Sequence, residues 1–156
     1  PVVFTSSVLD LEKDWIDYNG HLNMAYYNVL FDRASDQAFD LLGVGAGYAR
    51  ERGLTIYTAE IHLCYVRELH LGDRVVGTFQ LIDYDAKRLH SYQELHHVDG
   101  WIAATCETLS LHIDMAGPKV APFPADIVSG LEAMFSAHWA LPRPGRVGRS
   151  IGIKRK

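Results

Sequence analysis

The longest amphipathic pattern in the chain runs from Met24 to Gly43. Apolar or small residues recur in it at steps of three and four, the spacing of one face of an α-helix. These positions are Met24, Tyr27, Phe31, Ala34, Ala38 and Leu41. The opposite face is polar, with Asn28, Asp32, Arg33, Asp36 and Asp40. With Asn23 as N-cap and Gly43 as C-terminal stop, the pattern predicts a helix of about five turns.

After residue 53, β-branched and aromatic residues become frequent, which is typical of strands. Four long strands are predicted at 54–69, 74–84, 89–98 and 101–114, separated by turns at HLGD, DAKR and Asp99-Gly100. Asp-Gly is a strong signal for a tight hairpin. A β-rich segment, VVFTSSVL at 2–9, precedes the long helix, and a terminal amphipathic helix is predicted over 125–138.

This order of elements favours one α+β domain. Consecutive strands joined by tight turns form an antiparallel sheet, and a helix with one apolar face packs across it. We therefore expect a long helix on an antiparallel five-stranded sheet over residues 1–125, with residues 126–156 adding a C-terminal helix and a basic tail to the same domain. Because such a sheet has exposed edges, a homodimer or homotetramer is expected.

Composition narrows the class of protein. The 156 residues are 48% apolar and 22% charged, ordinary values for a globular domain, and the net charge of −4 argues against a nucleic-acid partner. Apolar runs are too short for a transmembrane span, and the N-terminus lacks a signal-peptide pattern, so no membrane association is expected. Cys64 and Cys106 lie in strand-like segments and are expected to be buried free thiols, which indicates a cytoplasmic protein.

Polar residues gather directly before the long helix, in the segment DWIDYNGHLNM at 14–24. Asp17, Asn19, His21 and Asn23 alternate there with apolar or small residues. Three interpretations are open: a capping loop, a metal site, and a catalytic carboxylate beside an anion-binding helix end. Capping and turn chemistry is the common role of such loops. In the catalytic interpretation, the unpaired N–H groups of the first helical turn stabilise a developing oxyanion.

The longer segment DWIDYNGHLNMAYYNVLFDRA, and the later passage YVRELHLGDRV, resemble the hotdog-fold acyl-CoA thioesterases, most closely the 4-hydroxybenzoyl-CoA thioesterase branch. The matching positions in the first segment are Asp17, Gly20, His21, Asn23, Tyr26 and Tyr27. The resemblance implies a hotdog domain whose subunits pair to complete two active sites. It also implies that Asp17 is the catalytic carboxylate and that the backbone N–H of Met24 is the oxyanion donor. Direct attack by Asp17 and general-base activation of water both remain open.

The whole sequence, including the ending VGRSIGIKRK, is also similar to thioesterases of carnitine breakdown. That likeness implies betainyl-CoA as the substrate. Its acyl group ends in trimethylammonium, a cation that aromatic rings bind by cation–π attraction. The candidate substrate contacts are Trp15, His21, Asn23, Tyr27 and Glu60. Glu60 shares one predicted strand face with Thr58 and His62. The resemblance implies that this region can face the active site of the neighbouring subunit. The alternative role for Glu60 is a surface or interface ion pair.

Coenzyme A is part of this substrate, and no separate cofactor is expected. Its phosphates need cations, for which Lys87, Arg88 and Arg143 are the candidates. No metal site is expected, because neighbouring His96 and His97 point to opposite faces of a strand and no metal-binding spacing is present. Two rival functions remain: a hotdog dehydratase acting on a hydroxyacyl or enoyl thioester, and a non-catalytic acyl-CoA-binding protein.

Overall fold

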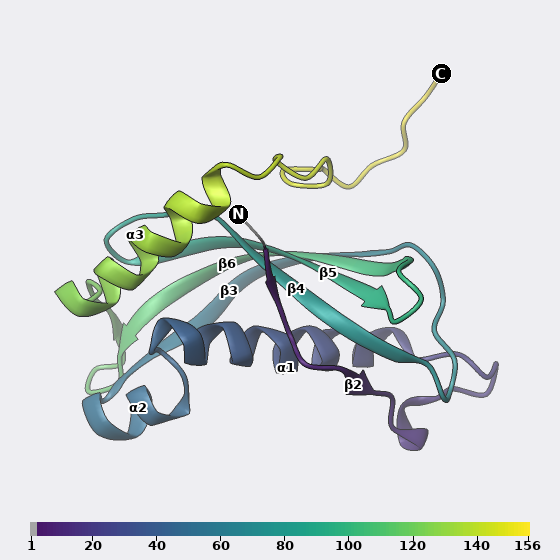
Figure 1. The fold of residues 1–156 in the computed structure, drawn as a ribbon, viewed down its shortest axis with the longest axis horizontal. Helices are drawn as coiled ribbons and strands as arrows, with labels where there is room; N and C mark the ends of the chain where they lie inside the picture. Colours follow the sequence, from purple (N-terminus) through teal and green to yellow (C-terminus); the bar gives the residue numbers. More distant parts are fainter. Residues whose placement is uncertain (1–2) are drawn as a thin grey trace.

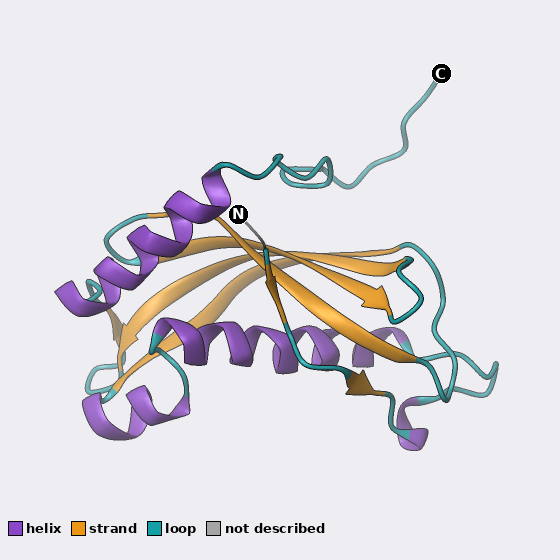
Figure 2. Ribbon diagram, in the orientation of Figure 1, coloured by secondary structure: helices purple, strands orange, loops and turns teal. Residues whose placement is uncertain are grey.

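A single antiparallel sheet organises the structure, a computed structural model that describes residues 3–156 (Figures 1 and 2). The strands lie in the order β1-β4-β5-β6-β3, while β2 also pairs with β4 and β7 with β6. They are β1 (Phe4–Thr5), β2 (Leu9–Asp10), β3 (Leu54–Tyr65), β4 (Arg74–Tyr84), β5 (Arg88–His97), β6 (Ile102–Asp114) and β7 (Lys119–Val120). The helices are α1 (Met24–Leu42), α2 (Ala46–Arg52) and α3 (Ala125–Trp139), with a 3-10 turn at Lys13–Trp15. The predicted α+β arrangement, a long helix packed on an antiparallel sheet, is confirmed.

Helix α1 lies along one face of the sheet, which arches over it (Figure 1). Its predicted ends are confirmed: the Asn23 side chain accepts the N–H of Ala25, and Gly43 closes the helix with φ 78°. The buried stripe is Tyr27, Leu30, Phe31, Ala34, Ala38 and Leu42. Met24 and Leu41 were predicted to be buried but are 67% and 68% exposed. From Ala38 a step of four residues stays nearer the buried face than a step of three, so Leu42 takes the place of Leu41.

The contact between α1 and the sheet is closest at β4. A Cβ atom on Gly77 would lie only 2.4 Å from the Cβ of Ala34, so two small residues allow this approach. One core cluster packs around the first half of α1 and a second around its last turns, α2 and α3. The first of these clusters packs the N-terminal half of α1 against the sheet.

Both cysteines are free thiols; Cys106 is buried, as predicted, and Cys64 is only partly buried.

The predicted first strand, VVFTSSVL, is two short strands rather than one. Strands β1 and β2 both pair with β4, and Ser6 between them exchanges bonds with Gly77 through its backbone N–H (2.8 Å) and its Oγ (2.9 Å). Val2 of this segment lies outside the described residues. Together with β7, these short strands make the sheet seven-stranded rather than five-stranded. Strands of two residues are too short to carry a recognisable period.

A β-bulge in β3 corrects the prediction that Thr58, Glu60 and His62 share one face. The pairing with β6 shifts between Thr58 and Glu60, so one extra residue is inserted in β3. Thr58 therefore lines the groove beside α1, whereas Glu60 and His62 line a cavity on the opposite face. A shift of one residue reverses the side to which every later residue points.

The two edges of the sheet differ in how far other elements cover them. The β4 edge is covered first by β1 and β2 and then by α3, whose His138 Nδ1 accepts the N–H of Leu81 at 2.9 Å. Burial lowers the pKa of His138, which favours the neutral ring that this bond requires. Within residues 3–156, β3 pairs only with β6, and its outer edge is open. No helix in the described part of the chain is long and apolar enough to cross a membrane.

Candidate active site

The loop that carries Asp17 is closed by its own backbone. Asp17 donates its N–H to the carbonyl of His21 (2.9 Å), and Gly20, with φ 81°, donates to the carbonyl of Asp17 (3.0 Å). The Oδ1 atom of Asp17 accepts the N–H groups of Asn19 (2.9 Å) and His21 (3.2 Å). Among the described residues, no hydrogen bond reaches Oδ2. One carboxylate oxygen therefore holds the loop while the other is available for chemistry, so the capping and catalytic interpretations are compatible.

The start of α1 presents one unpaired backbone donor. Asn23 uses its side chain for the N–H of Ala25 (3.0 Å) and its carbonyl for the N–H of Tyr26 (3.0 Å). The N–H of Asn23 itself bonds to the carbonyl of Trp15 at 2.9 Å. Within residues 3–156, no acceptor is bonded to the N–H of Met24. This donor lies at the positive end of the α1 dipole, where a developing negative charge is stabilised.

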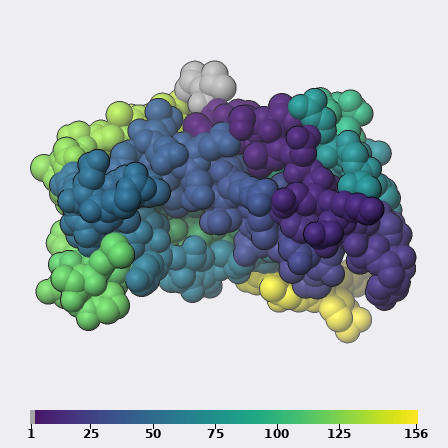
Figure 3. Space-filling view, turned by 90° about the horizontal axis from the view of Figure 1, so that it is seen from below, coloured from purple at the N-terminus to yellow at the C-terminus, as the bar shows by residue number. Residues whose placement is uncertain are grey.

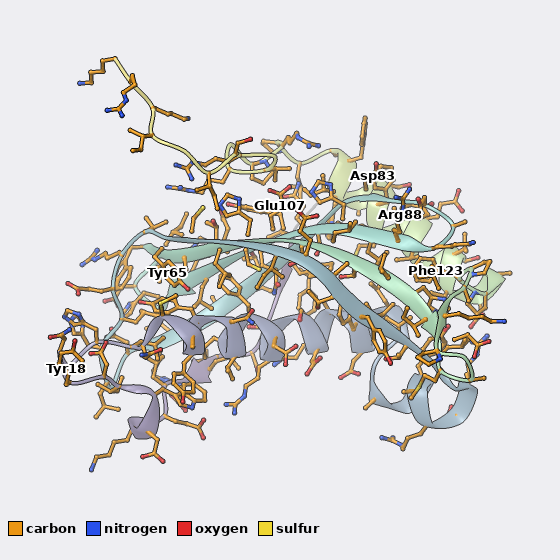
Figure 4. The ribbon with its side chains drawn as sticks, turned by 180° about the vertical axis from the view of Figure 1, so that it is seen from behind. Tyr18, Tyr65, Asp83, Arg88, Glu107 and Phe123 are labelled. Atoms are coloured by element: carbon orange, nitrogen blue, oxygen red, sulfur yellow. The ribbon has the colours of Figure 1, made fainter. Side chains whose placement is uncertain are left out.

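Asp17 and Met24 both line an open pocket of about 590 Å³. Its wall consists of residues 17–18, 21–24 and 65–68 together with Tyr27. The rings of Tyr27 and Tyr65 meet edge to face at 5.1 Å, and Tyr65 donates its hydroxyl to the carbonyl of Met24 at 2.9 Å. Burial raises the pKa of both tyrosines, so they are neutral phenols in this pocket. Figure 4 shows Tyr18 and Tyr65 at the same end of the molecule.

Two further charged groups, Glu68 and Arg67, line the pocket. Glu68 lies 2.9 Å from Nε2 of His21, its carboxylate oxygen facing the imidazole. Arg67 places its guanidinium 4.0 Å from the ring centroid of Trp101. No sequence pattern assigned a role to Arg67 or Glu68. They lie about 50 residues after Asp17 in a segment without local polar periodicity, and the only available signal was the resemblance of YVRELHLGDRV.

Two predicted substrate contacts lie away from this pocket. Trp15 is only 7% exposed, packs in the core and stacks on Tyr26 at 5.5 Å. Its carbonyl positions Asn23, so its effect on the site passes through the backbone. Glu60 lies instead in a cavity of about 380 Å³ on the other face of the sheet. There Glu107 accepts the N–H of Gly148 (2.9 Å) and faces His90 Nε2 (2.7 Å).

The predicted phosphate ligands are also distant from the pocket of their own chain. Lys87 lies in the β4–β5 turn and Arg88 begins β5, where its Nε donates to Asp85 at 2.7 Å. Figure 4 shows Arg88 and Tyr18 at opposite ends of the molecule. Arg143 is exposed in the tail that follows α3. The structure therefore brings together Asp17, His21, Asn23, Met24 and Tyr27, but not Trp15, Glu60, Lys87, Arg88 or Arg143.

A second groove, of about 540 Å³, runs between α1 and β3. In Figure 3, which views the molecule from the side of α1, green atoms of the later strands remain visible beside the blue helix. Asp32, Asp36 and Asp40 of α1 line the groove. Burial, together with the neighbouring Asp32 and Asp40 carboxylates, raises the pKa of Asp36. Because Thr58 and Ile61 of β3 form its other wall, the groove borders the open edge of the sheet.

Comparison with known families identifies the superfamily of this chain. Residues 11–131 match the family described as the Thioesterase-like superfamily. The chain belongs to this superfamily. A betainyl-CoA thioesterase of Pseudomonas aeruginosa is 36% identical to this thioesterase over 152 residues, which cover 97% of the chain and 96% of that protein. An L-carnitine dehydrogenase/betainyl-CoA thioesterase of Rhizobium meliloti is 36% identical over 90% of the chain, which spans only 28% of that longer protein.

Solved structures confirm the hotdog fold predicted for this thioesterase. A Staphylococcus aureus protein in complex with CoA superimposes with a TM-score of 0.90 at 27% identity, covering 98% of this chain and 96% of that one. A Pseudomonas putida KT2440 protein described as a thioesterase candidate superimposes with a TM-score of 0.86 at 31% identity, covering 99% of both chains. The predicted enzyme class, a thioester hydrolase, is confirmed by the family and by the names of these relatives.

Proposed function

We propose that this thioesterase hydrolyses betainyl-CoA to betaine and CoA at the pocket of Asp17. The observation that carries the proposal is one pocket in which a carboxylate with a free oxygen, an unpaired helix N–H and an aromatic, acidic wall occur together. The likeness to betainyl-CoA thioesterases supports the choice of acyl group. The CoA complex of the similar Staphylococcus aureus protein supports a CoA thioester.

Two groups of the chain perform the chemistry. The Met24 N–H donates to the thioester oxygen and stabilises the negative charge that develops on it in the transition state. Asp17 uses Oδ2 either to attack the carbonyl carbon, giving an anhydride that water then cleaves, or to take a proton from an attacking water. Either route expels the CoA thiolate. The loop bonds to Oδ1 hold the carboxylate in place and limit its reorientation.

The charge of the acyl group matches the wall of the pocket. In betainyl-CoA a single methylene separates the carbonyl from the trimethylammonium, so both groups must lie in the same pocket. The faces of neutral tyrosine rings attract such a cation within about 6 Å of the ring centroid. Tyr65 and Tyr27 supply these rings, and Glu68 supplies a carboxylate. Arg67, at the pocket wall, is the cation in the best position for a CoA phosphate.

A pair of isosteric substrates tests this recognition. In 3,3-dimethylbutyryl-CoA a tert-butyl group replaces trimethylammonium, so shape is kept and charge is removed. We expect wild type to hydrolyse betainyl-CoA with a kcat/KM about ten-fold higher or more, since cation–π and carboxylate attraction together contribute about 1–2 kcal/mol. Glu68→Gln should reduce this ratio about three-fold or more. Thiol release with both substrates measures it.

The control for this test is Glu12→Gln, because Glu12 is an exposed acid whose partner is Arg33 on the outside of α1. It should leave the ratio of the two kcat/KM values unchanged. Equal rates on both substrates in wild type would contradict betainyl specificity while leaving thioester hydrolysis intact. Turnover of an enoyl-CoA without thiol release would favour the dehydratase. Saturable binding of an acyl-CoA without turnover would favour the acyl-CoA-binding protein.

We further propose that two chains pair through their β3 edges. Tyr57 (46%) and Ile61 (41%) are exposed on this strand, and an open, apolar edge of this length pairs readily with another chain. Pairing of β3 with its own copy is isologous and closes the assembly at two chains. It would also border the groove beside α1 with a second subunit and extend the sheet across both chains.

We expect light scattering to give twice the mass of the chain for wild type. Ile61→Lys should lower this mass toward that of one chain, because an edge lysine opposes strand pairing. Val8→Lys is the matched control, since Val8 is 44% exposed but lies by the covered β4 edge. A monomeric wild type, or a dimer that is unaffected by Ile61→Lys, would contradict pairing through β3.

A further inference from the structure

Three side chains with metal-ligating atoms meet beside the pocket of Asp17, and two of them, His21 and Glu68, also line it. The ligand atoms of His21, Glu68 and His70 all lie within 4.8 Å of one another. Nε2 of His21 is 2.9 Å from Oε2 of Glu68, and the two imidazole rings are 5.0 Å apart at 83°. We propose that these three residues bind one divalent transition-metal ion, such as Zn²⁺.

The donor set suits such an ion. Two imidazole nitrogens and one carboxylate oxygen are ligands that Zn²⁺ accepts, and three protein ligands leave a position open for water. Metal–ligand bonds of about 2.0–2.2 Å bring ligand atoms to about 3–3.5 Å from one another. The His21–Glu68 pair already has this spacing. The side chains of His21, Glu68 and His70 are 39%, 56% and 52% exposed, so rotation about their own bonds can close the remaining gap.

The backbone holds the two contributing segments together. His21 and His70 face each other across an isolated β-bridge, and Leu22 donates its N–H to the carbonyl of Leu69 at 2.8 Å. The N–H of buried Leu69 bonds to the hydroxyl of Tyr27 at 3.1 Å. Glu68 and His70 flank Leu69, so both side chains point away from the core on one side. The backbone positions of the three ligands are therefore set by the fold before any ion binds.

An ion pair alone accounts less well for this cluster. His21 and Glu68 alone would suffice for an ion pair. The ring of His70, which lies edge to face with that of His21 near the same carboxylate, has no part in such a pair. A shared metal ion uses both rings in their neutral form. Oδ2 of Asp73 accepts the backbone N–H of His70 at 2.8 Å and lies 3.9 Å from its Nδ1, so Asp73 fixes the backbone of this ligand.

The site adjoins the catalytic loop, because the N–H and the carbonyl of His21 both bond to Asp17. A bound ion would fix this loop and add positive charge to the pocket. Hydrolysis of betainyl-CoA should then slow more than hydrolysis of its neutral isostere. This consequence rests on the proposed function, whereas the metal site itself does not.

Titration of the full chain with Zn²⁺ in a calorimeter, without substrate, tests the site. We expect wild type to bind one Zn²⁺ per chain at this site. His70→Ala should bind it at least about ten-fold more weakly, because one ligand is lost. Glu68→Gln should weaken binding in the same direction. His96→Ala is the matched control, because His96 also faces a glutamate (Glu94, 3.1 Å) but belongs to no three-ligand group of the described residues.

Equal zinc affinity in wild type and both ligand variants, or no saturable binding in wild type, would overturn the proposal. Circular dichroism and thermal unfolding establish that each variant is folded. His62 and Cys64, whose ligand atoms are 3.6 Å apart, are present in every variant, so any binding there cancels in the comparison. Because binding is read without turnover, failure here leaves the thioesterase proposal untouched, and failure of that proposal leaves the metal site testable.

Discussion

Asp17→Asn is expected to lower kcat for thioester hydrolysis by about 10²–10⁴-fold, the usual effect of losing a catalytic acid–base group. The substitution separates the two roles of the side chain. The oxygen of an asparagine amide can still accept the N–H groups of Asn19 and His21, which Oδ1 of Asp17 accepts in wild type. The amide nitrogen, in the place of Oδ2, is neither a nucleophile nor a base. The loop should therefore keep its shape while the reaction slows.

Single-turnover and steady-state thiol release with betainyl-CoA measure this effect. Asp14→Asn is the control, since it removes the same charge from an exposed residue in the preceding 3-10 turn. It should retain activity within about two-fold, because exposed charges are strongly screened. Asp17→Ala should lose activity and also lower the melting temperature, because the loop bonds are lost. Full activity in Asp17→Asn would show that Asp17 only shapes the loop, and Glu68 would become the next candidate.

Met24→Pro is expected to reduce kcat by about 10²–10³-fold, the usual effect of losing one oxyanion donor. Met24 is the first residue of α1, the one helical position at which proline is well tolerated. Asn23 before it has φ −61° and ψ 141°, a conformation that a following proline permits. The N–H of Met24 bonds to no acceptor among residues 3–156, so its removal costs the fold no hydrogen bond. The substitution thus deletes the proposed donor together with the methionine side chain, without breaking a hydrogen bond of the fold.

Met24→Ala provides the matched control, because it removes the same 67% exposed side chain and keeps the N–H. We expect its kcat to stay within a few-fold of wild type, with KM carrying any change from lost contact with the acyl group. Melting temperatures should be similar for both variants. If Met24→Pro and Met24→Ala hydrolysed betainyl-CoA equally, the oxyanion donor would have to be sought elsewhere in the pocket.

Local patterns predicted most of the elements that build the site. The helix from Met24, its Asn23 cap and its Gly43 stop depend on residues within a few positions of one another, as do the hairpin turns between the long strands. Asp17 and Met24 are seven residues apart and belong to one loop–helix unit. Their placement in one pocket therefore follows from short-range geometry, whereas the catalytic roles that the resemblance implies for them stay predictions.

Errors arose where one residue changes a register or where the packing partner is distant. The bulge at Thr58 and Glu60 has no distinctive composition, yet it moves Glu60 to the face opposite the groove. Leu42 takes the place of Leu41 in the core, since the step of four residues from Ala38 points it toward the cluster that α2 and α3 complete. Trp15 is an aromatic residue close to the Asp17 loop, as a ligand contact would be, but the surrounding core encloses it.

The sequence by itself determined the α+β class, the extent of the long helix, the four long strands and the loop that presents Asp17 beside a helix N-terminus. Each of these depends on periodicity and capping among near neighbours. Only the tertiary structure decided that Arg67 and Glu68 complete the pocket and that His70 lies against His21. Residues 67–70 lie about 50 positions after the Asp17 loop, and their proximity to it results from how the β3–β4 connection packs against that loop. No local pattern encodes such a contact, because it depends on the register of the whole sheet.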